Sequence, residues 1–179
     1  PDANGLGAEP DGILMDITGC DHLFGGEAAL LDDLIARFRG FGVAARAVAA
    51  ATPGAAWALA RFGERKVFVL PEGEEEYALK GLPLRALRLS PGICDGLHRL
   101  GLKKVGDLYG RPRAPVTARF GPDVVRRLDE ALGRAAEPIS PEIPLVPFRA
   151  RLLFAEGLTR IEDIETAVER LAVELCDLL

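Results

Sequence analysis

Residues 89–108 read Leu-Ser-Pro-Gly-Ile-Cys-Asp-Gly-Leu-His-Arg-Leu-Gly-Leu-Lys-Lys-Val-Gly-Asp-Leu, and this stretch decides how the chain around it folds. Pro91-Gly92 is typical of a turn, because proline fixes φ at about −65° and glycine tolerates positive φ. Apolar residues then recur at helical spacing, at Ile93, Leu97 and Leu100. Gly101 follows where a helix C-terminal glycine is expected. The stretch therefore predicts a helix–hairpin–helix: a turn, a helix, a second turn and a short helix.

The first turn of this unit is a candidate binding site. A glycine turn at a helix N-terminus offers backbone N–H groups to a phosphate oxygen, and the helix dipole favours the negative charge. We expect Gly92 and the N–H groups of Ile93 and Cys94 to form this site. Such a contact positions DNA without reading its sequence. A helical hairpin without a ligand is the alternative that the local sequence leaves open.

Charge is unevenly distributed along the 179 residues, whose net charge is −5. Residues 81–136 hold 11 Lys/Arg against 5 Asp/Glu, whereas the segments on both sides are acidic. The basic segment contains the helix–hairpin–helix, and charge by segment is a better guide to a nucleic-acid partner than the pI of the whole chain. We expect phosphate contacts from Lys103, Lys104, Arg111 and Arg113.

Several function classes are disfavoured by composition. No apolar run is long enough to span a membrane. The three cysteines, Cys20, Cys94 and Cys176, are far apart and lack metal-binding spacing, which favours a reducing, cytosolic setting without zinc. The two histidines, His22 and His98, lie in different predicted elements, so neither a histidine metal site nor a Ser-His-Asp triad is expected. We predict no cofactor and no metal.

Residues 1–80 are predicted to alternate strands and helices as an α/β layer. Expected strands cover 13–18, 43–51 and 66–70, and expected helices cover 27–38 and 53–62. An acidic turn over 71–76 is expected to start a third helix that ends at residue 79. Residues 81–136 predict short helices only. Residues 137–147 are proline-rich and predict an extended linker, followed by a strand over 148–154 and a helix over 159–178. The fold class predicted is α+β.

This order of motifs resembles the Y-family of translesion DNA polymerases. The palm of that family has a strand ending in Leu-Asp-Val-Thr-Gly and a later Leu-Phe-Gly, matched here by residues 14–19 and 23–25. Its thumb has a Pro-Gly-Ile-Gly hairpin followed by a Leu-Gly and a Gly-Asp-Leu, matched by residues 91–94 and 100–108, with Cys94 in place of the second glycine. The resemblance implies a partial palm (1–80), a thumb (81–136), a linker (137–147) and a truncated little finger (148–179).

The chain departs from the family at the catalytic positions. Active members carry an Asp-Glu pair ahead of the Leu-Asp-Val-Thr strand, and this pair helps to hold two metal ions. The alignment places Asp11 at the aspartate and Gly12 at the glutamate, so one carboxylate is missing. The family's Asn-Lys at the start of a palm helix is replaced by residues 52–55, Thr-Pro-Gly-Ala. We therefore expect no nucleotidyl transfer.

These losses resemble the ImuB-type subgroup, inactive Y-family homologues of bacterial mutasomes. The resemblance implies a cytoplasmic, nucleoid-associated adaptor in SOS mutagenesis. Such an adaptor binds primer–template DNA by its backbone and recruits an error-prone replicative-type polymerase, a RecA-like accessory protein and the sliding clamp. Two alternatives stay open: a fragment of an active translesion polymerase, and a protein-interaction scaffold whose thumb no longer meets DNA.

Overall fold

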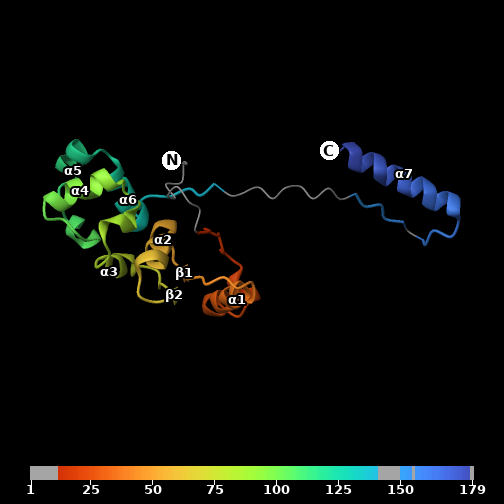
Figure 1. Cartoon of the computed structure of the whole chain (residues 1–179), viewed down its shortest axis with the longest axis horizontal. Helices are drawn as coiled ribbons and strands as arrows, with labels where there is room; N and C mark the ends of the chain where they lie inside the picture. The colour runs from red at the N-terminus through yellow and green to blue at the C-terminus, as the bar shows by residue number, and fades with distance from the viewer. Residues whose placement is uncertain (1–11, 141–149, 155, 178–179) are drawn as a thin grey trace. The chain divides into compact units, whose positions relative to one another are not determined.

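The computed structural model describes residues 12–140, 150–154 and 156–177. The chain divides into two compact units, Pro1–Ser140 and Pro141–Leu179, which are described separately (Figure 1). Within the described residues the first unit is a mixed helical structure with one two-stranded parallel sheet, in agreement with the α+β class. The break between the units falls inside the predicted linker.

The sheet lies between two helices of the first unit. Strands β1 (Ala47–Ala49) and β2 (Val67–Val69) pair in parallel, and helix α2 (Pro53–Phe62) connects them, as parallel pairing requires a crossover. Side chains alternate between the two faces of a strand. Ala47 and Ala49 pack with helix α1 (Glu27–Gly40), whereas Val48 packs with the cluster that contains α2.

The strand predicted over residues 13–18 is wrong, because this segment has no regular secondary structure. Within the described part of the chain no strand pairs with it, and Ile13 is 74% exposed. Instead, the Asp16 carboxylate accepts a hydrogen bond from the Thr18 backbone N–H at 3.0 Å, which begins a turn. The Thr18 side chain, and after it this backbone N–H, lower the pKa of Asp16. The strands predicted over 43–51 and 66–70 exist but are only three residues long.

Short helices form the rest of the first unit, as predicted for residues 81–136. Before residue 81 they are the 3₁₀ helix η1 (Asp21–Leu23) and α3 (Glu75–Leu79). After it they are the 3₁₀ helices η2 (Leu84–Leu87) and η3 (Val105–Leu108), α4 (Pro91–Arg99), α5 (Arg113–Phe120) and α6 (Asp123–Ala131). One buried apolar cluster runs from Ala55 in α2 through Leu84 and Leu97 to Ala131 in α6. The boundary expected at residue 80 therefore does not separate two cores.

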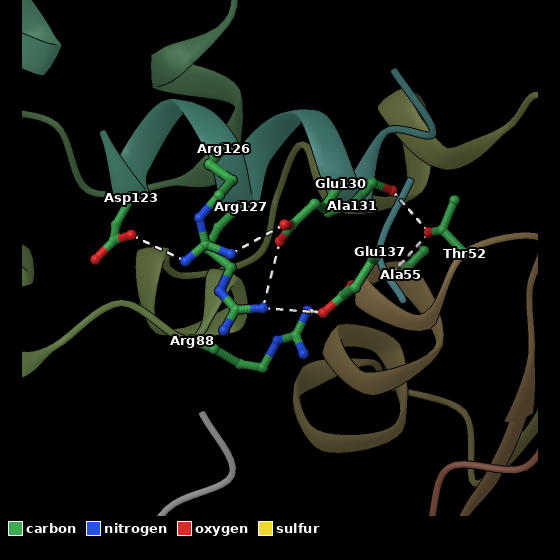
Figure 2. Close-up of polar contacts among 9 residues, drawn as sticks. All are labelled: Thr52, Ala55, Arg88, Asp123, Arg126, Arg127, Glu130, Ala131 and Glu137. Carbon is green, nitrogen blue, oxygen red and sulfur yellow. Dashed lines mark hydrogen bonds and ion pairs between the residues drawn. The ribbon is translucent and has the colours of Figure 1, made fainter. Parts of the chain in front are cut away.

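The contact between α2 and α6 explains this continuity. The Thr52 hydroxyl caps α2 by accepting a hydrogen bond from the Ala55 N–H at 3.1 Å, and it donates to the Ala131 carbonyl at 3.0 Å (Figure 2). Gly54 lies so close to α6 that a Cβ atom there would stand 2.9 Å from the Ala131 Cα. Segments on the two sides of residue 80 are therefore joined by backbone contact.

The second unit contains helix α7 (Ile161–Asp177), which confirms the helix predicted over 159–178 apart from its ends. The strand predicted over 148–154 is not formed at residues 150–154, and residues 148–149 lie outside the described part of the chain. No helix in the described ranges combines the length and apolar character needed to cross a membrane.

Candidate nucleic-acid interface

The first turn of the helix–hairpin–helix is a helix cap rather than a glycine turn. Ser90 is the N-cap of α4, and its hydroxyl accepts a hydrogen bond from the Ile93 N–H at 3.4 Å. Pro91 is the first helical residue, where proline is favoured. Gly92 follows inside the helix without a positive φ, so the turn predicted for Pro91-Gly92 is wrong.

The predicted phosphate site at this turn is only partly available. The Cys94 N–H is bonded to the Ser90 carbonyl at 3.0 Å, as in any helix, so it is not free for a phosphate. The Cys94 side chain is 3% exposed in the core, and this burial raises the pKa of its thiol. Gly92 is exposed, and its N–H has no partner within the described residues. Gly92 therefore stays a candidate, whereas the Ile93 N–H is held by the Ser90 hydroxyl and Cys94 has a structural role.

The second turn holds two lysines on a fixed backbone. The Asp107 Oδ2 atom accepts hydrogen bonds from the backbone N–H groups of Lys103 and Lys104, both at 2.8 Å. These two bonds lower the pKa of Asp107. Gly106 lies against Lys80, whose carbonyl accepts the Gly106 N–H at 3.0 Å, and a Cβ on Gly106 would stand 2.9 Å from that oxygen. Both lysine side chains are exposed.

Arg111 extends this positive surface. Its Nε atom donates to the Asp107 carbonyl at 2.9 Å, which ties the arginine to the turn that carries the two lysines. The structure thus brings together three of the predicted phosphate-binding residues, and we call Lys103, Lys104 and Arg111 the basic turn. The charges of Lys104 and Arg111 act on the Asp107 carboxylate. This carboxylate accepts hydrogen bonds from two backbone N–H groups rather than from the lysine side chains.

Arg113 belongs to a different environment. Its guanidinium forms a two-pronged ion pair with the Asp129 carboxylate on α6, with 2.8 Å between Nη2 and Oδ1. The pair raises the pKa of Arg113 and offsets its charge. Arg113 is therefore a weaker candidate for a phosphate contact than the basic turn.

A cavity beside the basic turn is lined in part by Tyr109 and Arg134, which no sequence motif indicates. Arg111, Arg113 and Arg134 line it together with apolar side chains of α5 and α6. Tyr109 also lines the cavity, donates its hydroxyl to the Glu76 carbonyl at 2.9 Å, and has its pKa raised to about 12 mainly by burial. Arg134 belongs to no sequence motif. It lines the cavity because it follows the C-terminal end of α6.

The predicted catalytic remnants form no site in the described residues. Asp11 lies outside the described part of the chain, and Gly12 is exposed and offers no side-chain ligand. Asp16, the next carboxylate along the chain, is hydrogen-bonded to the Thr18 N–H. Among the described residues, no group of three His, Cys, Asp or Glu side chains is placed to hold a metal ion.

Comparison with known proteins shows which proteins the chain is similar to. It is 48% identical over 164 residues to Protein ImuB from Caulobacter vibrioides, with the same values for strain NA1000 / CB15N and strain ATCC 19089 / CIP 103742 / CB 15. The match covers 91% of this chain and 36% of each relative, so the chain spans about a third of their length. No protein-family model matches the chain, and no solved structure does. The identity over nine-tenths of the chain supports an ImuB-type protein.

Proposed function

We propose that this chain is a DNA-binding, non-catalytic part of an ImuB-type protein in a mutagenesis and translesion system. Its DNA contact is to the phosphate backbone, and the basic turn is the principal contact surface. Recruitment of an error-prone polymerase, a RecA-like accessory protein and the sliding clamp belongs to the same proposal.

The observation that carries the DNA proposal is the basic turn itself. Lys103 and Lys104 have their backbone N–H groups fixed by Asp107 while their side chains are exposed. In the described part of the chain neither lysine side chain takes part in an ion pair. A phosphate that approaches this turn therefore meets two exposed ammonium groups that are not engaged in an ion pair within the described residues, although Asp107 lies in the field of Lys104.

The non-catalytic character rests on Gly12. Two-metal nucleotidyl transfer needs several carboxylates close together to balance the charge of the ions. Glycine cannot ligate a metal through a side chain, and Asp16 is held by a local turn. An active polymerase fragment is the alternative, and it requires a metal-binding set that does not include residue 12.

Binding of two duplexes of unrelated sequence by the whole chain tests the DNA proposal. We expect Lys103→Ala with Lys104→Ala to weaken binding of both duplexes about equally at low salt, because backbone contacts are independent of sequence. The matched control is Arg39→Ala with Lys66→Ala, which removes the same charge from exposed positions on other elements. Equal affinity of the parent and the basic-turn variant favours the scaffold without DNA contact.

A further inference from the structure

A buried ion pair holds the segment that follows α6. The Glu137 Oε1 atom lies 2.5 Å from Arg88 Nη2 and 2.9 Å from Arg127 Nη1 (Figure 2). The side chains of Arg88 and Glu137 are only 3% and 9% exposed. Glu137 thus stands at the start of the proline-rich segment predicted as a free linker, but its carboxylate is inside the first unit.

The same cluster continues along α6. Arg127 Nη1 also lies 3.3 Å from Glu130 Oε2, and Arg126 Nη1 donates to Glu130 Oε1 at 3.0 Å. Glu130 is 5% exposed. Two buried carboxylates therefore share the guanidinium group of Arg127, and removal of Glu137 leaves Arg88 without its ion-pair partner.

Trp57 packs against this cluster. The Arg88 guanidinium carbon lies 5.8 Å from the centroid of the indole ring. Trp57 Nε1, Arg88 Nε and Glu137 Oε2 are buried and have no hydrogen-bond partner within the described part of the chain. While Glu137 is held between the two arginines, these three atoms therefore lack hydrogen bonds. Water would supply them if the segment after α6 left the first unit.

The segment that Glu137 holds is otherwise weakly attached. The N–H groups of Arg134 and Ala135 bond to the Asp129 carbonyl, but residues 136–140 are in no helix or strand, and none of their N–H groups bonds to the described backbone. The ion pair of a single side chain thus decides whether these five residues belong to the first unit or to the connection that follows it.

We propose that Glu137 is an ionic latch, closed on Arg88 and Arg127, that opens to lengthen the connection between the two units. Opening releases residues 136–140 while α6 stays folded. At about 3.4 Å per extended residue, the five residues add about 17 Å to the reach of the connection. The latch thereby sets how far the second unit can move from the first when each meets its own partner.

Limited proteolysis of the whole chain tests the latch. We expect Glu137→Gln to raise the rate of cleavage within residues 136–140 by about tenfold or more, with hydrogen exchange in α4 and α6 unchanged, because the amide keeps the shape but loses the charge that pairs with Arg88. Glu137→Asp keeps the charge on a shorter side chain and should give an intermediate increase. Glu156→Gln, at an exposed position of the second unit, is the control and should change nothing at 136–140.

Trp57 supplies a second readout, because it is the one tryptophan of the chain. Release of Glu137 should raise acrylamide quenching of its fluorescence in the Gln variant and less in the Asp variant. Unchanged cleavage within residues 136–140 in both variants overturns the proposal. Loss of protection throughout α6 in both also overturns it, because Glu137 is then a part of the core rather than a latch.

Discussion

Thr52 connects the sheet-bearing part of the first unit with its helical part, and its loss has a calculable cost. Its hydroxyl accepts the Ala55 N–H and donates to the Ala131 carbonyl, so Thr52→Ala removes a helix cap and a hydrogen bond between α2 and α6. A cap is worth about 1 kcal/mol and a half-buried hydrogen bond about 1 kcal/mol. We expect Thr52→Ala to lower the free energy of unfolding by about 2 kcal/mol. Thr52→Ser keeps both bonds and should cost clearly less.

Urea unfolding followed by Trp57 fluorescence measures this difference, because Trp57 lies in α2 and reports on the first unit. With an m-value of about 2 kcal/mol per molar urea, the midpoint of the Ala variant should fall by about 1 M. The reasoning is refuted if the Ala and Ser variants have the same midpoint. In that case the contact between α2 and α6 depends on apolar packing alone.

Three further predictions concern packing, titration and chemistry. Gly54→Ala should lower stability by about 1–3 kcal/mol in thermal melting, because the new methyl group meets the α6 backbone; Gly92→Ala, where a Cβ meets nothing within 4 Å, should not destabilise the chain. The pKa of Tyr109 is raised to about 12. The stability that its neutral hydroxyl contributes is therefore complete below a pH of about 10 and is lost as the pH rises toward 12. Ultraviolet titration of the tyrosine and unfolding measured at several pH values will show this loss. Primer-extension assays with Mg²⁺ or Mn²⁺ should detect no synthesis, and extension that Asp11→Ala abolishes contradicts the role assigned to Gly12.

Local signals in the sequence predicted most helices of the first unit. Thr52 followed by proline predicted the start of α2, and the hydroxyl of Thr52 caps that helix. Gly101 predicted the end of α4 and has a φ of 79°, a conformation that side chains with a Cβ rarely adopt. These features depend on a few neighbouring residues, which is why they can be read without a structure.

Features that depend on distant partners were not predictable in the same way. Residues 13–18 have β-branched and apolar composition, but a strand also needs a pairing partner, and the described residues provide none. The Cys94 N–H was expected at a phosphate because it lies near a helix N-terminus, whereas this N–H bonds to the Ser90 carbonyl and the side chain is buried in the core. Glu137 sits among prolines, and only the packing of Arg88 and Arg127 shows that it is buried.

The candidate interface also combines features that the sequence predicts with features that depend on distant partners. Charge along the chain indicated the basic segment, and the turn containing Asp107 holds Lys103 and Lys104 as exposed neighbours of Arg111. Arg113 carries the same charge and is close in sequence, but Asp129 on α6 pairs with it. The sequence therefore indicated the basic segment, and the structure shows which of its side chains are exposed and which are paired with a carboxylate.

The salt dependence of duplex DNA binding tests the central claim most directly. Each phosphate neutralised by a lysine or arginine contributes about 0.9 to the slope of log K against log salt. We expect a negative slope for the parent that becomes flatter by up to about two units when Lys103 and Lys104 are replaced by alanine. The change should be the same on unrelated sequences, and Arg39→Ala with Lys66→Ala should leave the slope as it is. Identical slopes for the parent and the Lys103/Lys104 variant contradict the account.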